Sequence, residues 1–592
     1  MCCYTSLLPQ CSIHLPPLTS PPWQRHVSTS VGGCGWSRCV YNCTDVPGDS
    51  QIYPCGPAHP LCSHSPTKPT YQYHLADATC DINDPNGPFY DPEHKLYHNF
   101  YQIHVAEDQG GAGDGPDWGH WISKDFVHWA QLPVAIWNDR YFDNSAIFSG
   151  STTIVNGRPV IMYPGRCETG GEGTPVCNDG NGGFTFALAV PTNGSDPTYT
   201  QWSKEGSIGG QPFTNPVLNF TGDDPSTAWR TKDGGWRLIG NTRCSPEGGT
   251  GGNAIFGSAD FVAWYLVGCI TNMMSGECPS IFPLPSLTPG SEHYVASHLR
   301  RAPMPTHVHK ASLKNGAGYF EDKSQVGIWI DGAPGPVGQG GTAGNWEVTA
   351  GSVAQFVDRG KAYAGKDFYD PTGKGRRILW LWGQLESGIQ TVPREVTYHP
   401  GLQRLVYAPV AEMLQLRTAK LDSASAVPVL APLTLRASAH CELELTFAMP
   451  PSATNIEVRL PHGAAVTVSY TLPTTPEESV EGRGPGTLPE AWMVQVSLGG
   501  FNDSLPLLAD DTSLTMRVFL DGFVAEAYFM GGRVALTSDL VDLGGVTNVQ
   551  VASTAEVTLN EAVIYAMGDI HVEVDEVVNA LQVSGLGRDD TR

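Results

Sequence analysis

Residues 514–529 read LTMRVFLDGFVAEAYF and combine two alternating stretches with a turn signal. Apolar residues recur at every second position in Leu514–Leu520 and again in Phe523–Phe529, which is the period of a strand with one buried face. Asp521-Gly522 lies between the two stretches. Asp-Gly tolerates the positive φ angles of a type I′ turn, so this stretch predicts a β-hairpin in an all-β fold.

The alternating pattern continues beyond this hairpin. Residues 529–537 carry Gly531-Gly532 between two more strand-like stretches, which predicts another hairpin. Tryptophan becomes scarce from about residue 411 onward, while the apolar alternation sharpens. We therefore expect a β-sandwich domain over residues 411–592, with a short polar tail after about Val583.

Residues 70–410 are also strand-rich. The chain contains 67 Gly and 47 Pro, and short apolar stretches alternate here with turns, without a convincing helix pattern. About 340 residues built in this way are typical of a sandwich, a barrel or a propeller. Expected strands include Lys95–Ile103, Pro159–Tyr163, Phe184–Val190, Trp236–Gly240 and Arg377–Trp382.

Residues 1–69 are rich in Cys, Pro and Ser and predict a poorly ordered leader or a small disulfide module. Of the 15 cysteines, nine lie within the first 80 residues, a density typical of an oxidising compartment. A zinc site is the alternative, but the cysteine spacings match no usual ligand pattern. The N-terminus lacks the pattern of a signal peptide. Four Asn-x-Ser/Thr sites are compatible with an extracellular, cell-wall or vacuolar protein; they are Asn42, Asn193, Asn219 and Asn502.

The charge balance excludes several classes of partner. The chain has 35 Lys plus Arg against 59 Asp plus Glu, a formal net charge of −24. Such a polyanion repels nucleic acid and anionic membrane surfaces. The longest apolar runs are too short to span a bilayer as a helix, so we expect a soluble protein.

Three short acidic motifs carry the chemistry. They are Asn83-Asp84-Pro85-Asn86-Gly87, Asp223-Asp224-Pro225 and Glu277-Cys278-Pro279. Each motif alone reads as a turn or a surface strand end, because Asp-Pro and Asn-Gly are turn formers. A turn at a strand end can also hold a carboxylate rigidly toward a pocket.

Together the three motifs resemble the N-D-P-N-G, R-D-P and E-C boxes of glycoside hydrolase family 32, the invertases and fructan-active enzymes. The resemblance spans residues 71–537. Further matching stretches are Phe100-Tyr101-Gln102, Trp118-Gly119-His120, Ser123-Lys124-Asp125, Phe148-Ser149-Gly150-Ser151, Asp358-Arg359-Gly360-Lys361, Tyr363-Ala364 with Lys366, and Arg376-Arg377-Ile378-Leu379-Trp380.

The resemblance implies a five-bladed β-propeller followed by a C-terminal β-sandwich. About 340 residues over five blades give roughly 65–70 residues per four-stranded blade. Asp84 and Asp224 are 140 residues apart, and Asp224 and Glu277 are 53 apart. The three acids should therefore come from three different blades and converge at the central channel.

The resemblance also implies a retaining hydrolysis of sucrose or a fructan, with two carboxyl groups about 5 Å apart. Asp84 would be the nucleophile with a low pKa, Glu277 the acid/base with a raised pKa, and Asp224 the transition-state stabiliser. No metal or other cofactor is expected. The oligomeric state stays open. Substrate-binding residues would be Asn83, Gln102, Trp118, Phe148 and Ser149, with Asp358 and Lys361 as a pair that goes with sucrose use in plant members.

Three departures from the family pattern keep other functions open. Asp223 stands where the family has Arg, and Arg230 is a candidate substitute for that cation. Asp81 replaces an aromatic residue, and Phe148 replaces Trp. The alternatives are a fructan exohydrolase, a fructosyltransferase, a catalytically weak sugar-binding relative, and a lectin built on the sandwich.

Overall fold

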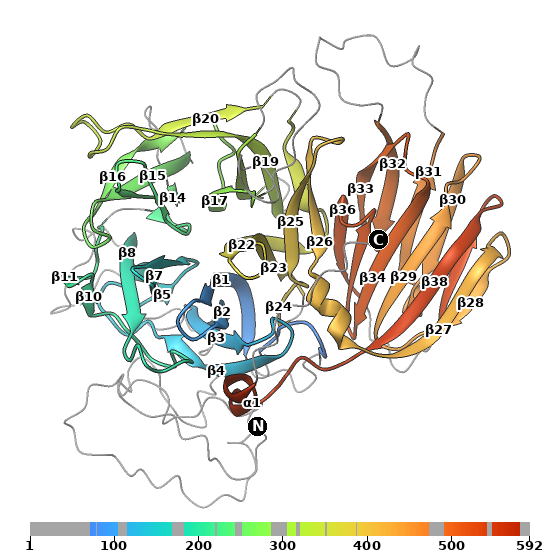
Figure 1. Cartoon of the computed structure of the whole chain (residues 1–592), viewed down its shortest axis with the longest axis horizontal. Helices are drawn as coiled ribbons and strands as arrows, with labels where there is room; N and C mark the ends of the chain where they lie inside the picture. The colour runs from blue at the N-terminus through green and yellow to red at the C-terminus, as the bar shows by residue number, and fades with distance from the viewer. Residues whose placement is uncertain are drawn as a thin grey trace, which may run out of the picture.

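The structure is a computed structural model. It describes residues 71–77, 80–104, 115–167, 183–219, 222–242, 252–270, 272–285, 305–314, 320–349, 352–385, 387–472, 491–540 and 548–580. The expected leader over residues 1–69 and the polar tail after Val583 lie outside these residues. The fold is all-β, a five-bladed propeller followed by a sandwich, as expected (Figure 1).

Five antiparallel sheets form the ring of blades. The first blade contains β1 (Asp81–Asp91), β2 (Leu96–His104), β3 (Asp117–Ser123) and β4 (Trp129–Ile136). The second contains β5 (Ala146–Ile147), β6 (Ser151–Val155), β7 (Arg158–Cys167), β8 (Gly183–Pro191) and β9 (Trp202–Ser203), followed by the hairpin of β10 (Gly206–Ile208) and β11 (Gln211–Phe213).

The third blade contains β12 (Gly222–Asp223), β13 (Trp229–Arg230), β14 (Trp236–Thr242), β15 (Gly252–Ser258) and β16 (Trp264–Ile270). The fourth contains β17 (Glu277–Pro283), β18 (His307–Lys314), β19 (Phe320–Asp331), β20 (Gly344–Val348) and β21 (Gln355–Asp358). The fifth contains β22 (Ala362–Asp370), β23 (Arg376–Gly383), β24 (Ile389–Gln390), β25 (Arg394–His399) and β26 (Arg404–Pro409).

A 3₁₀ helix, η5 (Ala411–Leu416), leads from the ring into the sandwich. One sheet of the sandwich has the order β27 (Arg417–Pro428), β38 (Thr558–Met567), β29 (His440–Ala448), β34 (Ser513–Asp521), β35 (Val524–Phe529) and β36 (Val534–Asp539). The other has the order β28 (Leu433–Arg436), β37 (Asn548–Ser553), β30 (Thr454–Arg459), β31 (Ala465–Tyr470), β32 (Ala491–Leu498) and β33 (Phe501–Leu508), with a short 3₁₀ turn, η6 (Pro461–Gly463).

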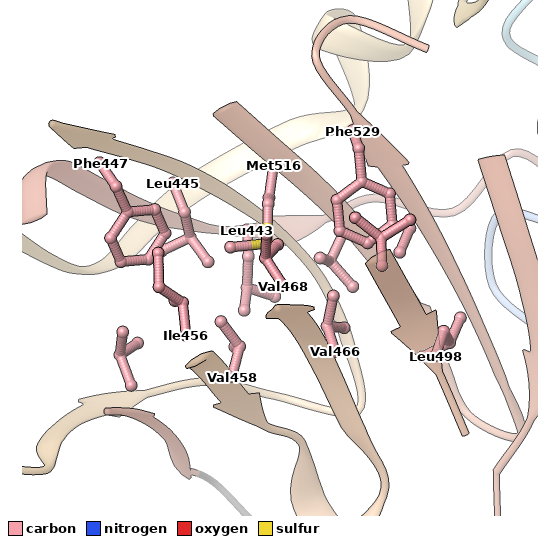
Figure 2. Packing of buried hydrophobic residues seen from close by; sticks show 14 of the residues in the cluster. Leu443, Leu445, Phe447, Ile456, Val458, Val466, Val468, Leu498, Met516 and Phe529 are labelled. Carbon is pink, nitrogen blue, oxygen red and sulfur yellow. The ribbon is translucent and has the colours of Figure 1, made fainter. Parts of the chain in front are cut away.

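The inner faces of the two sandwich sheets form the largest apolar core. Alternate residues of each strand point inward, as the period-2 pattern predicts. Leu443, Leu445 and Phe447 of β29 face Ile456, Val458, Val466 and Val468 of β30 and β31, with Met516 and Phe529 nearby (Figure 2). This packing fixes the sandwich as one rigid unit.

The hairpin over residues 514–529 is present, but its turn is shifted by one residue from the prediction. Asp521 pairs with Val524, so Gly522 and Phe523 form the loop. Only Gly522 of these two has a positive φ, at 64°, as in the first central position of a type II′ turn. The shift has a physical reason, because the Asp521 carboxylate is buried and accepts hydrogen bonds from the backbone N–H groups of Gln72 and Tyr73.

A buried network of charges joins the propeller to the sandwich. Arg394 Nη2 of the fifth blade donates to Asp358 Oδ2 at 2.7 Å and to Glu526 Oε2 at 3.0 Å. His74 Nδ1 lies 2.8 Å from Asp521 Oδ2, and its Nε2 lies 3.0 Å from Glu526 Oε1. Burial alone lowers the pKa of His74, but the hydrogen bonds to Asp521 and Glu526 raise it to about 9.

The chain returns to the propeller near its C-terminal end. The backbone N–H of Trp129 donates to Ile570 O at 2.7 Å. The helix α1 (Val574–Asn579) then lies below β4, with Val577 packed against Leu132. This helix was not expected from the sequence, and it places part of residues 411–592 on the first blade.

The described cysteines are of two kinds. Cys80, Cys167 and Cys269 are disulfide-bonded, while Cys278 and Cys441 are buried thiols. Among the helices in the described part of the chain, none combines the length and the hydropathy that a membrane span requires.

Candidate active site

Three strands that begin different blades carry the three predicted acids. Asp84 lies in β1, Asp224 directly follows β12, and Glu277 is the first residue of β17. The expectation from their spacing, that they come from three blades, is confirmed. The strand ladders shift register next to Asp84 and Glu277, and such bulges redirect side chains.

Cys278 connects the acidic motifs of the three blades. Its backbone N–H donates to Asp224 Oδ2 at 2.8 Å, and its thiol donates to Asp84 Oδ2 at 3.8 Å. Cys278 and Asp224 both have positive φ angles, 45° and 51°, which non-glycine residues rarely adopt. The strained backbone turns one amide and one carboxylate toward the same pocket. Sequence reasoning assigned no role to Cys278 beyond its place in the motif.

A chain of hydrogen bonds holds the carboxylate of Asp84. Ser149 Oγ donates to Asp84 Oδ2 at 2.5 Å, and Gln102 Nε2 donates to Ser149 Oγ at 2.7 Å. Asn83 Nδ2 donates to Gln102 Oε1 at 2.5 Å and to Asp84 Oδ1 at 3.2 Å. Three predicted substrate-binding residues, Asn83, Gln102 and Ser149, are thus brought together around Asp84.

The two predicted aromatic residues lie beside this chain in different ways. Trp118 is fully buried, and its Nε1 donates to the Phe148 carbonyl at 3.0 Å. A Cβ on Gly87 would come within 3.3 Å of the Trp118 ring, so the ring packs directly beneath the Asn83–Gly87 motif. Phe148 is half-buried and makes an edge contact with Phe184. Trp118 therefore supports the pocket from below.

Glu277 has two partners that the sequence did not identify. Tyr363 donates from its hydroxyl to Glu277 Oε2 at 2.8 Å, and Lys314 Nζ lies 2.6 Å from Oε1. Tyr363 belongs to the fifth blade and Lys314 to the fourth, so the carboxyl group is held from two sides. Phe320, which is 38% exposed, packs its ring edge-on against Tyr363 at the solvent-exposed side of the site, where Lys314 also lies.

The comparisons with known proteins agree with this arrangement. Residues 74–409 match the model described as "Glycosyl hydrolases family 32 N-terminal domain". The chain belongs to glycosyl hydrolase family 32. A relative named fructan 6-exohydrolase from Triticum aestivum is 31% identical over 374 residues, which is 59% of this chain and 58% of that protein. A relative named beta-fructofuranosidase, insoluble isoenzyme 3, from Oryza sativa subsp. indica is 31% identical over 378 residues, 58% of this chain and 57% of that protein.

The chain thus matches just under three-fifths of the length of these two family 32 relatives. Among solved structures, fructan 1-exohydrolase IIa from Cichorium intybus is similar with a TM-score of 0.60 and 20% identity. The match covers 86% of this chain and 100% of that chain. The likeness therefore extends over the propeller and the sandwich.

The electrostatics of this family 32 pocket differ from expectation at Asp84. We expected a low pKa, but burial raises the pKa of Asp84 to about 7. The hydrogen bond from Ser149 and the charge of Lys366 oppose this rise, while the charges of Asp224 and Glu277 add to it. Several carboxyl groups in one desolvated pocket make each other harder to ionise, which the sequence motif does not show.

Asp223 and Asp224 share the same environment. Burial raises the pKa of Asp223, and the charges of Asp224 and Glu277 raise it further. Burial also raises the pKa of Asp224, while the charge of Lys366 lowers it. Burial and the neighbouring carboxylates thus raise the pKa of both Asp223 and Asp224, so the adjacent pair is harder to ionise than either group alone.

Arg230 does not replace the missing arginine of the family 32 motif. It is exposed on β13, where its Nη1 donates to the Gly234 carbonyl and its guanidinium lies over the Trp236 ring. This expectation was wrong, because β13 pairs at the far end of β14 from β12 and points the side chain to the surface.

Asp358 and Lys361 also lie away from the pocket, so their expected contact with sugar is corrected. The buried carboxylate of Asp358 accepts from Arg394 and from the backbone and hydroxyl of Thr537, which leaves it no free face for a ligand. Lys361 Nζ pairs with Asp539 Oδ2 at 2.7 Å. Both residues belong to the contact between propeller and sandwich.

Within the described ranges, no group of three or more His, Cys, Asp or Glu side chains is arranged to hold a metal ion. The site offers carboxylates from three blades, a hydrogen-bonded amide and hydroxyl, and a tyrosine. Such a set can supply a nucleophile, a proton donor and acceptors for sugar hydroxyls.

Proposed function

We propose that this chain is a retaining β-fructofuranosidase that hydrolyses sucrose to glucose and fructose. The single observation that carries the proposal is the meeting of Asp84, Asp224 and the Glu277-Cys278 pair from three blades of a family 32 propeller. The relative named beta-fructofuranosidase supports the choice of substrate class.

In the first half of the reaction, a carboxylate oxygen of Asp84 attacks the anomeric carbon of the fructosyl ring. The glycosidic bond breaks, and Glu277 gives its proton to the leaving oxygen, so that glucose departs as a neutral alcohol. In the second half, Glu277 takes a proton from water. The resulting hydroxyl attacks the same carbon and releases Asp84.

The other carboxylate stabilises the charge that develops between these two steps. Asp224, held by the Cys278 amide, accepts hydrogen bonds from fructose hydroxyls that strengthen as the ring becomes oxocarbenium-like. Tyr363 keeps the Glu277 carboxyl directed into the pocket. Ser149 and Gln102 fix the direction of the Asp84 carboxylate, so that little conformational freedom is lost when it reaches the attacking geometry.

The raised pKa of Asp84 sets the working range of this mechanism. Attack requires the carboxylate, and the pKa of the buried group is about 7. The value of kcat/KM should therefore fall as the pH decreases through this region, because kcat/KM reports the free enzyme. Assays should extend from pH 5 to above pH 8.

The direct test measures glucose release from sucrose by wild type and by Asp84→Asn over this pH range. We expect a loss of at least about 10³-fold in kcat, since the amide cannot form the covalent intermediate. Asp233→Asn, an exposed turn residue of the third blade, serves as the matched control and should retain full activity. Equal rates for wild type and Asp84→Asn would end the proposal and leave a sugar-binding relative.

Fructan exohydrolysis is the second candidate, because one relative is named fructan 6-exohydrolase. The same residues would act, and only the leaving group would differ. The ratio of kcat/KM for sucrose to that for inulin and levan distinguishes the two. Kestose-like products in concentrated sucrose would instead indicate a fructosyltransferase.

An oxidising compartment, outside the cell or in the vacuole, is the proposed location. Three disulfide-bonded cysteines support it, since such bonds persist where thiols are not kept reduced. Asn193 and Asn502 are exposed members of Asn-x-Ser sites, so both are accessible to glycosylation.

A further inference from the structure

Lys366 lies on β22 of the fifth blade, where a bulge sets its direction. The pairing of β22 with β23 shifts between Tyr363 and Lys366, and Ala364 has a φ of 54°. The backbone N–H groups of Ala364 and Gly365 donate to the two carboxylate oxygens of Asp322, at 3.1 and 2.8 Å. These bonds fix the bulge, and the bulge decides which way the next side chain points.

The Lys366 side chain is buried and lacks a hydrogen bond. The residue is only 4% exposed, and Nζ has no hydrogen-bond partner among the residues that the structure describes. Neighbouring buried cations differ in this respect. Lys310 Nζ pairs with Asp322 at 3.1 Å, and Arg377 Nη1 pairs with Asp367 at 2.9 Å.

A buried ammonium without a direct partner is costly unless opposite charge lies near it. Here that charge comes from the acid pocket. The strand β22 lies against β1 and β17, which carry Asp84 and Glu277, and the charge of Lys366 lowers the pKa of Asp84, Asp223 and Asp224. The titratable and charged groups on the strands around it include Asp84 of β1, Asp223 and Asp224 at β12, Glu277 and Cys278 of β17, Lys310 of β18, Asp322 of β19, Tyr363 and Asp367 of β22, and Arg377 of β23.

The pocket has few other sources of positive charge. Arg230 points to the surface, Lys310 is paired with Asp322, and Lys314 is bound to Glu277 at the open side. Within the described residues around the pocket, Lys366 is thus the buried cation that forms no ion pair with a single carboxylate.

We propose that Lys366 is the counter-charge of the acid pocket, a positioning residue that keeps Asp84 in the ionised form in which it attacks. It takes this part because Asp223 stands where a cation would otherwise adjoin Asp224. The expected effect on kcat/KM rests on the proposed function, whereas the expected effect of the Lys366 charge on stability does not.

The kinetic test compares wild type with Lys366→Met, Lys366→Arg and the control Lys420→Met, an exposed lysine of the sandwich. We expect the acidic limb of kcat/KM to move upward by about one pH unit in Lys366→Met, a loss of about tenfold below the limb. Lys366→Arg and Lys420→Met should keep the limb of wild type. An unmoved limb in Lys366→Met, or equal shifts for Met and Arg, would overturn the inference.

A second measurement needs no substrate and separates this inference from the proposed function. The Tm of Lys366→Met should fall further below that of wild type at pH 8, where Asp84 with its pKa of about 7 is mostly ionised, than at pH 5. The same difference at both pH values would refute the electrostatic part. If wild type fails to hydrolyse fructosides while the Tm difference depends on pH, the proposed function fails and the role of Lys366 as counter-charge stands.

Discussion

Replacing Ser149 by Ala tests how the pocket controls its nucleophile. Ser149 is fully buried, and its hydroxyl donates to Asp84 Oδ2 at 2.5 Å while accepting from Gln102. The alanine removes one oxygen and leaves the backbone unchanged. In wild type this hydrogen bond stabilises the ionised carboxylate of Asp84. Because the variant lacks the bond, the pKa of Asp84 should be higher in it.

The size of the effect follows from the kind of bond. A hydrogen bond to a charged group contributes about 1.5–3 kcal/mol, and one pKa unit corresponds to about 1.4 kcal/mol. The pKa of Asp84 should therefore rise from about 7 by roughly one to two units. At pH 6 the ionised fraction, and with it kcat/KM, should fall by about 10- to 100-fold.

The assay is glucose release from sucrose between pH 5 and 9.5 for Ser149→Ala and wild type. The loss should shrink to a few-fold at the alkaline end, where Asp84 is ionised in both proteins. Ser553→Ala, which removes a 2.6 Å hydrogen bond to the Ala555 carbonyl in the sandwich, is the matched control. A loss of the same size at every pH would refute this reasoning, because it would mean that Ser149 acts on geometry alone.

Three further predictions concern stability and modification. Arg394→Met should lower the free energy of unfolding in urea by about 3–5 kcal/mol, because two buried carboxylates lose their cation; a change below 1 kcal/mol would contradict this. The pKa of His74 is raised to about 9, so its contribution of about 3 kcal/mol should be complete below pH 6.5 and lost as the pH rises toward 9. His74→Gln should therefore show a lower Tm at pH 6 and a flatter decline than wild type above it, and parallel curves would argue against the linkage. Enzymatic removal of N-glycans should reduce the mass of the wild-type peptide that contains Asn193 but leave the mass of the same peptide from Asn193→Gln unchanged, as mass spectrometry would show.

The sequence predicted the fold and the placement of the acids for an identifiable reason. Turn-rich strands and two hairpin signals indicated an all-β fold with a C-terminal sandwich, but they left a sandwich, a barrel or a propeller open for residues 70–410. The resemblance of the three motifs to family 32 implied the five-bladed propeller, and the spacing of Asp84, Asp224 and Glu277 then assigned them to separate blades. These features depend on local pattern and on count, both of which a linear sequence carries.

Facing directions were less predictable. Asp358 and Lys361 lie close in sequence to Tyr363, yet they bind partners at the sandwich, while Tyr363, at the bulge in β22, donates its hydroxyl to Glu277. A shift of one residue moves the following side chains of a strand to the opposite face of the sheet, and no residue type in this segment indicates the bulge. The raised pKa of Asp84 was missed for a related reason, since it depends on desolvation by three blades at once.

The division of one pocket among the first strands of separate blades has a consequence for folding. A fragment that lacks any contributing blade holds an incomplete set of groups, so partial folding should give no partial turnover. Catalytic activity therefore requires that the last blade is packed against the first, where β22 lies against β1. During gradual denaturation, turnover should therefore be lost as soon as the first and fifth blades separate, even while the individual sheets remain folded.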